Sequence, residues 1–219
     1  MNMKTDLSDV ADPVYGRPPA PCSAFTLVEL IVVLAVISML LAFTAPSLAR
    51  VIAANRLTAA GEGLLFKISL AQQVSVTESR PVELRLYSYT ADGEVGFHAY
   101  QLFFLNESGG AATAMENPTY LGEGSVMIAK GGLSPLLDAL NGGKETVVDV
   151  EPFKTLGAKY QSLVFYPNGS TNIHLPLRSA YITMAQPGSF PAAGANSTPD
   201  NYYTLQIDPV TGRGRSYRP

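Results

Sequence analysis

The chain has 219 residues, and its 15 Lys and Arg against 18 Asp and Glu give a formal net charge of -3. Only 15% of the residues are charged and 47% are hydrophobic, which excludes a disordered chain and a general nucleic-acid binder. Nineteen Gly, 16 Pro and 11 Tyr without any Trp favour short strands joined by turns over an all-helical bundle.

Cysteine and histidine form no metal-binding or catalytic pattern. Cys22 is the only cysteine, so an intrachain disulfide and a Cys-based zinc site are excluded. His98 and His174 lie far apart and lack the spacing that places two ligands on one helix face. No Ser/His/Asp arrangement, phosphate-binding loop or paired-carboxylate motif occurs in a usable context. We therefore expect a protein that is not an enzyme and has no catalytic residues, metal or cofactor.

A long apolar run near the N-terminus predicts a membrane segment. The residues from Phe25 to Leu48 carry a single charge, Glu29. As a helix this run would extend about 36 Å at about 1.5 Å per residue, enough to cross a hydrocarbon core of about 30 Å. A core helix of a soluble domain is disfavoured, because such helices seldom stay apolar on all faces over this length. Residues 25–49 are thus a predicted transmembrane segment.

The start of this run resembles the processing site of type IV prepilins and type II secretion pseudopilins. The matching residues are Ser23-Ala24-Phe25-Thr26-Leu27-Val28-Glu29-Leu30, with Ala24 in a place where the family usually has Gly. The resemblance implies that prepilin peptidase cuts between Ala24 and Phe25 and that the new amino group is methylated. Residues 1–24 would then be a cytoplasmic leader. It also implies that Glu29 serves filament assembly, neutralising the Phe25 amine of a neighbouring subunit in an apolar filament core.

Two other interpretations of the N-terminal segment remain open. Ser47-Leu48-Ala49 has the small-x-small form of a signal-peptidase site and would make the protein secreted. A signal h-region is typically 7 to 15 residues long, however, and lacks an internal acid. The other alternative is a permanent single-span anchor that is not processed.

After the apolar run the pattern becomes that of an amphipathic helix, over residues 50–80. Apolar residues recur three or four positions apart and mark one helix face that should pack on a sheet: Leu57, Ala60, Leu64, Ile68 and Ala71. Arg80-Pro81 predicts the end of the helix, because the residue before proline is pushed out of the α region.

Residues 81–219 predict a β-rich globular domain. Val82 to Tyr87 alternates apolar and polar residues like a half-buried strand, and a turn at 91–94 leads into Val95 to Leu105 as the second strand of a hairpin. Leu133 to Leu140 predicts a short helix capped by Ser134. Further strands are predicted at Ser125–Ala129, Thr146–Val150, Ser162–Tyr166, Thr171–Leu175, Ala180–Met184 and Tyr203–Asp208. The fold class is α+β: a long N-terminal helix, transmembrane then amphipathic, packed on antiparallel sheets.

Three later segments extend the resemblance to the GspH/FimT group of minor pseudopilins and pilins: 80–82 after the helix, 163–169 in the middle and 208–213 near the end. The last seventeen residues are also similar to a prepilin-like set called Verru_Chthon cassette protein D. These resemblances imply a pilin-like domain and a minor pseudopilin or pilin of a type II secretion pseudopilus or type IV pilus-like filament. The implied partners are other pilin or pseudopilin subunits, prepilin peptidase and the inner membrane, crossed once with the globular domain in the periplasm.

DNA is a second candidate partner. Arg213, Arg215 and Arg218 lie in a C-terminal tail without an acid after Asp208, and arginine contacts phosphate through a planar guanidinium group. In the FimT branch a GRxR tail is associated with DNA binding during uptake, and Gly212-Arg213-Gly214-Arg215 has that spacing. The other interpretation is a solvated strand whose arginines pair with nearby acids. A third functional alternative is a secreted or membrane-anchored β-rich protein.

Overall fold

The computed structural model describes residues 25–91, 93–106, 111–148, 151–190 and 198–218, without the side chains of 43–47 and 141. The chain divides into two compact units, one ending at Pro46 and one beginning at Ser47, and each is described by itself. Helix α1, Leu27–Thr77, contributes to both. Over the described residues, no helix combines the length and hydropathy needed to cross a bilayer. The transmembrane segment at residues 25–49 stays a prediction.

In the second unit, α1 is amphipathic as predicted. All five residues of the expected face are buried, and Leu57, Leu64 and Ile68 are completely inaccessible. The helix ends three residues before Arg80, whose backbone N–H donates to the Ser75 carbonyl at 3.2 Å. The predicted stop before Pro81 is therefore confirmed.

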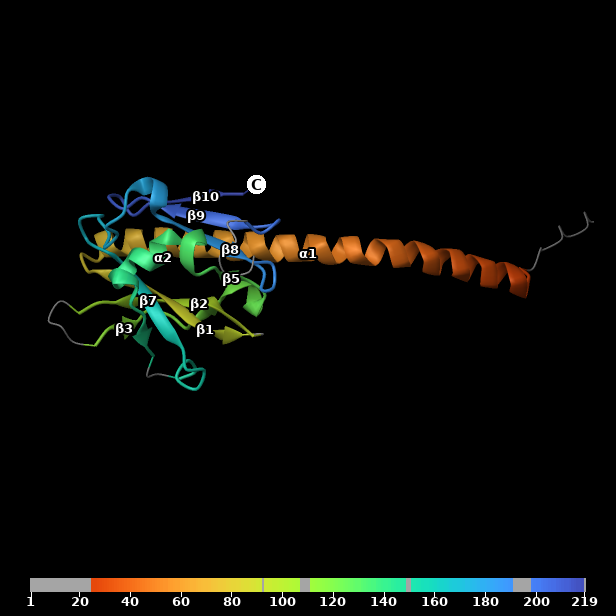
Figure 1. Cartoon of the computed structure of the whole chain (residues 1–219), viewed down its shortest axis with the longest axis horizontal. Coiled ribbons are helices and arrows are strands. Elements are labelled where there is room, and N and C mark those ends of the chain that lie inside the picture. The colour runs from red at the N-terminus through yellow and green to blue at the C-terminus, as the bar shows by residue number, and fades with distance from the viewer. Residues whose placement is uncertain (1–24, 92, 107–110, 149–150, 191–197, 219) are drawn as a thin grey trace, which may run out of the picture. The chain divides into compact units, whose positions relative to one another are not determined.

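An antiparallel sheet packs around this part of α1 (Figure 1). Its central hairpin joins β1, Val82–Ala91, to β2, Glu94–Phe104, as predicted. The strand order is β10-β9-β8-β5-β2-β1-β7-β6, and two short strands, β3 and β4, also pair with β2. The other strands are β3 Thr113–Ala114, β4 Thr119–Tyr120, β5 Met127–Ile128, β6 Thr146–Val147, β7 Lys159–Phe165, β8 Tyr181–Ala185, β9 Tyr203–Ile207 and β10 Gly214–Tyr217.

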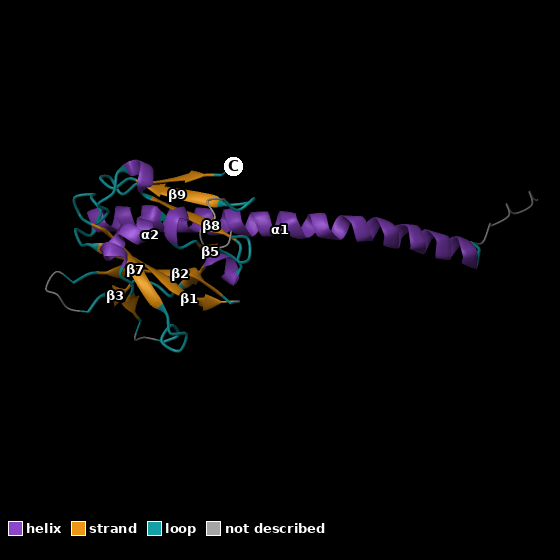
Figure 2. Ribbon diagram, in the orientation of Figure 1, coloured by secondary structure: helices purple, strands orange, loops and turns teal. Residues whose placement is uncertain are grey.

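Short helices connect the strands (Figure 2). Helix α2, Pro135–Ala139, lies inside the predicted 133–140 segment. The 3-10 helices are η1 Leu121–Gly124, η2 Gly131–Leu133, η3 Leu140–Gly143 and η4 Leu177–Ser179. The α+β class with a long N-terminal helix packed on antiparallel strands is thus the observed fold.

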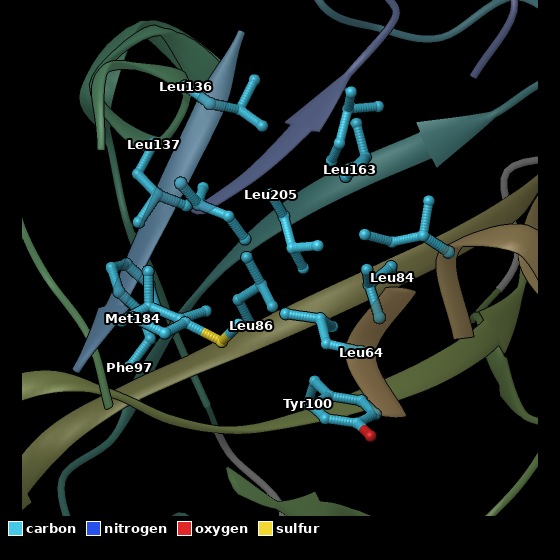
Figure 3. Close-up of a cluster of buried hydrophobic side chains, with 14 of the residues drawn as sticks. Leu64, Leu84, Leu86, Phe97, Tyr100, Leu136, Leu137, Leu163, Met184 and Leu205 are labelled. Carbon is cyan, nitrogen blue, oxygen red and sulfur yellow. The ribbon is translucent and has the colours of Figure 1, made fainter. Parts of the chain in front are cut away.

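The main core lies between α1 and the inner face of the sheet. Leu64 of α1 points among Leu84, Leu86 and Tyr100 from the central hairpin (Figure 3). Side chains from α2, β7, β8 and β9 extend the same cluster. Burial of a large aliphatic side chain contributes about 1.5–3 kcal/mol to the stability of the fold, so this helix face stabilises the packing of α1 on the sheet.

The half-buried character predicted for the first strand is wrong, because β1 is buried on both faces. Tyr87, expected to face solvent, is 3% exposed and stacks on Phe153 with ring centroids 4.0 Å apart. A second cluster, with Ala99, Phe103 and Ala158, covers the outer face there. Phe153 is distant in sequence from β1. The alternation of residues 82–87 therefore could not predict that Phe153 would cover the outer face of this strand.

Two further local predictions are wrong. Residues 171–175 form only an isolated bridge between Thr171 and Phe165 instead of a strand. The Asn172 side chain takes the place of strand pairing, accepting from the Val164 N–H at 2.9 Å and donating to the Ser162 carbonyl at 3.2 Å. Ser134 makes no side-chain cap on α2, because its hydroxyl accepts the backbone N–H of Thr183 at 2.9 Å.

Candidate functional site

At its N-terminal end, α1 has a defined cap made by residues of the processing motif. The hydroxyl of Thr26 accepts the backbone N–H of Glu29 at 3.1 Å, which satisfies one of the helix's open amide donors. Glu29 thus lies in the first turn, where a carboxylate is favoured by the helix dipole. Its side chain is exposed, as is Phe25 at 79%. Ala24, the predicted residue before the cut, lies outside the described residues.

The first unit leaves its apolar helix surface uncovered. Leu27, Leu30 and Leu34 expose between 54% and 74% of their surface, and the valines and isoleucines between them are similarly open. Soluble monomers seldom expose a continuous apolar surface of this kind. An exposed apolar surface of this kind is typical of a site that contacts lipid or other protein chains.

The second candidate site is the C-terminal hairpin of β9 and β10. The Asp208 carboxylate accepts the backbone N–H groups of Val210 at 2.9 Å and Thr211 at 3.3 Å. These two hydrogen bonds, with Val210 contributing most, and the charge of Arg215 hold the pKa of Asp208 below its usual value. The turn is closed when the Gly212 N–H donates to the Asp208 carbonyl at 2.8 Å.

Both glycines of the Gly212-Arg213-Gly214-Arg215 sequence have structural roles. Gly212 has a φ of 68°, a left-handed conformation that favours glycine. Gly214 lies so close to α1 that a β-carbon there would be 2.5 Å from Cδ1 of Leu65. The alternation of β10 therefore turns residue 214 toward the helix and Arg215 away from it.

The three predicted DNA-binding arginines are all exposed, yet they differ in their contacts. Within the described part of the chain, Arg213 and Arg215 have no side-chain hydrogen bond or salt bridge. Arg218 instead folds back onto α1, donating to the Thr58 hydroxyl, to the Ala54 carbonyl at 3.4 Å and to Asn201 Oδ1 at 3.3 Å. The structure thus leaves Arg213 and Arg215 exposed and ties Arg218 to α1.

Gln206, a residue that the sequence did not single out, organises the face next to these arginines. It stands opposite Arg215 on β10 and opposite Tyr181 on β8. Its Oε1 accepts the Tyr217 hydroxyl at 3.2 Å, and its Nε2 donates to the Leu177 carbonyl at 2.8 Å. Only the pairing of three strands creates this arrangement, so no local pattern could have revealed it.

Ser88, Lys130 and Glu145 form a polar cluster elsewhere in the second unit. Lys130 donates to Ser88 Oγ at 3.1 Å and to Glu145 Oε1 at 2.5 Å, beside a cavity of about 230 Å³. Glu145 forms an ion pair with Lys130 and also accepts the Ser88 hydroxyl at 3.2 Å. No group of three His, Cys, Asp or Glu side chains able to hold a metal occurs among the described residues.

Comparison with known proteins finds a prokaryotic N-terminal methylation motif at residues 20–45. This range contains Ala24, Phe25 and Glu29. No curated protein matches the chain.

Two similar solved structures are crystal forms of the type IV minor pilin FimU of Pseudomonas aeruginosa PAO1. One is 17% identical, with a TM-score of 0.40, over 75% of this chain and 93% of FimU. The other is 16% identical, with a TM-score of 0.38, over 74% of this chain and 97% of FimU.

Proposed function

We propose that this protein is a minor subunit of a type IV pilus-like filament or type II secretion pseudopilus, processed by prepilin peptidase before Phe25. The methylation motif at residues 20–45 is the observation that carries the proposal. It coincides with the helix start whose apolar side chains are left uncovered in the isolated chain. A pilin-like subunit needs such a surface, because its helix must first reside in the inner membrane and then pack among other subunits.

The assembly mechanism rests on two opposite charges in an apolar setting. Cleavage before Phe25 would release a cationic amine, and Glu29 places a carboxylate in the first turn of α1. Removing either partner of a desolvated pair costs about 3–5 kcal/mol, so the pair would fix the register between subunits. The surrounding packing would come from exposed side chains of the same helix: Leu27, Leu30, Val33, Leu34 and Ile37.

Processing is tested by intact mass and N-terminal sequencing of the protein purified from its own membranes. A methylated N-terminus at Phe25 is expected. A chain starting after Ala49 would instead indicate a secreted β-rich protein, and an intact Met1 would indicate an unprocessed membrane anchor; either result would overturn the filament mechanism.

Charge pairing is tested separately with Glu29→Gln, which removes the charge while leaving the Thr26 cap to the backbone amide. We expect loss of filament incorporation without unfolding of the second unit. Glu62→Gln is the matched control, since Glu62 is another exposed acid of α1 in the second unit. Normal incorporation of the Glu29→Gln variant would contradict the mechanism.

DNA binding by the same subunit is a second candidate function, favoured by the placement of Arg213 and Arg215. Both arginines are exposed, and Arg215 lies on the face of β10 that points away from α1. Tyr217, 52% exposed on that face, could stack on a base. A mobility-shift assay with the full chain in non-ionic detergent tests this function. A shift at low salt that the Arg213→Ala/Arg215→Ala double variant loses is expected, and no shift by the unaltered chain would refute it.

A further inference from the structure

Positive charge is concentrated in the C-terminal part of the mature sequence. Residues 174–219 contain four arginines and only two acids, Asp200 and Asp208, whereas residues 25–173 carry an excess of acids. Strands β8, β9 and β10 all come from this basic segment and are neighbours in the sheet. The fold therefore gathers the basic segment into one arm of the sheet.

Arg178 belongs to this arm although it lies far from the tail in sequence. It is exposed in η4, directly after Leu177, whose carbonyl accepts the Gln206 amide at 2.8 Å. Gln206 in turn stands opposite Arg215. The Gln206 side chain therefore contacts the turn that carries Arg178, and its residue pairs with the one that carries Arg215.

The acid of this arm that interacts with Arg215 is Asp208. Asp208 uses its carboxylate to close the β9–β10 turn, accepting from Val210 and Thr211. Arg178 has no hydrogen bond or salt bridge to another side chain among the residues that the structure describes. Arg178, Arg213 and Arg215 are thus exposed arginines of this arm that have no side-chain hydrogen bond or salt bridge among the described residues.

We propose that Arg178 is a third phosphate-binding residue. A nucleic-acid backbone would cross β10, β9 and β8 along a row of three arginines, from Arg213 and Arg215 to Arg178. This inference rests on the DNA-binding candidate function and extends it, because the ligand runs across the strands instead of along the tail. Gln206, held by Tyr217 and Leu177, spaces the cations and is a positioning residue. The shared ligand chemistry is the phosphodiester backbone, which single strands and duplexes both present.

The test compares Arg178→Ala with Arg56→Ala, a control at an exposed arginine of α1. The full chain in non-ionic detergent is titrated with a duplex and with its separated single strand, each across a series of salt concentrations. Arg178→Ala should weaken binding about tenfold at low salt and reduce the salt slope by about 0.9 for the duplex or about 0.7 for the single strand. Arg56→Ala should leave both quantities unchanged, and thermal unfolding followed by circular dichroism should show both variants folded.

Each outcome has a separate meaning. If the Arg213→Ala/Arg215→Ala variant loses binding while Arg178→Ala binds like the unaltered chain, DNA binding stands and the row is overturned. If Arg56→Ala weakens binding as much as Arg178→Ala, the attraction is general and the row is also overturned. If the unaltered chain binds neither probe at low salt, both the DNA function and the row fail. An effect on only one probe would support the row and identify the form of nucleic acid that it contacts.

Discussion

Gly61 of α1 lies directly against the ring of Tyr203 on β9, so closely that a β-carbon at this position would overlap the ring. A glycine in a helix normally costs about 1 kcal/mol relative to alanine. Here it permits the helix and the strand to approach. We therefore predict that Gly61→Ala lowers the free energy of unfolding by about 1–2 kcal/mol, since overpacking costs about 1–3 kcal/mol. Chemical denaturation followed by circular dichroism measures the change.

Gly63→Ala is the matched comparison and should have the opposite sign. A β-carbon there would meet only the hydroxyl of Tyr100, at 3.6 Å, which is an ordinary contact. The variant should gain up to about 1 kcal/mol from helix propensity. Equal destabilisation by both substitutions would show that α1 tolerates no side chain at either position, contrary to this contact geometry.

Gly212→Ala should loosen the turn between β9 and β10. A left-handed conformation costs an L-residue about 1–2 kcal/mol, and the added β-carbon would also lie 3.0 Å from Cδ1 of Phe165. Gly188 is a control, because its φ is 78° and nothing lies within 4 Å of its β-carbon position. Gly212→Ala should therefore destabilise the protein more than Gly188→Ala in the same unfolding measurement. Equal losses would mean that Phe165 moves aside without cost.

Arg218 should affect β10, the strand that carries Arg215, without itself binding DNA. Its hydrogen bonds to Thr58, Ala54 and Asn201 fasten the residue after β10 to α1 and to the loop before β9. We predict that Arg218→Ala speeds hydrogen exchange of the Tyr217 amide and leaves the salt slope of DNA binding unchanged. A loss of slope as large as that of Arg213→Ala would place Arg218 among the phosphate ligands instead.

Asp208 should make the stability of the turn between β9 and β10 depend on pH in acidic solution. Its pKa in the folded protein lies below the ordinary value of about 3.9, chiefly because the Val210 N–H donates to the carboxylate. The carboxylate therefore contributes fully to stability above about pH 3.9, and this contribution is lost as the pH falls through the folded pKa. The amide shifts of Val210 and Thr211 should titrate with a midpoint below about 3.9 in an NMR experiment. Asp208→Asn should abolish that titration, and a midpoint at or above the ordinary value would contradict the assignment.

Tyr87 should make the stability of the protein depend on pH in alkaline solution. Burial raises its pKa to about 12, from an ordinary value of about 10. The neutral phenol is favoured in the folded state, so its contribution is complete below about pH 10 and is lost as the pH rises through about 12. Burial also raises the pKa of Tyr89 and of Tyr100, so ultraviolet absorbance should show several tyrosines ionising late, and one fewer in Tyr87→Phe. No difference between the two titrations would exclude Tyr87 as one of the late groups.

Patterns that repeat within a single element predicted the fold well. The spacing of Leu57, Leu64 and Ile68 identified the buried helix face because a helix has a fixed period. The hairpin followed from two strands joined by a short turn. Features that depend on distant segments could not be predicted this way: Phe153 covering Tyr87, Asn172 replacing a strand, and Gln206 joining Arg215 to the Arg178 turn.

The same distinction between local patterns and distant contacts holds for the two candidate sites. The processing motif is a contiguous run, so the order of its residues is enough to recognise it, and the methylation motif at residues 20–45 includes it. The arginines of the tail are visible as a cluster in the sequence, whereas their separation into two free groups and one tethered group is not. That separation comes from Gly214 facing α1 and Arg218 reaching Thr58, contacts made between the two ends of the folded unit.

The packing of β10 on α1 also affects how the chain folds during synthesis. Gln72 donates to the Thr211 carbonyl, 139 positions later, at 3.0 Å. Contacts of such high sequence separation slow folding, because a long loop must close before they form. A nascent chain emerging N-terminus first therefore lacks the cover that β10 gives to Leu65 until its last strand follows. The packing of α1 is completed only when almost the whole chain has been translated.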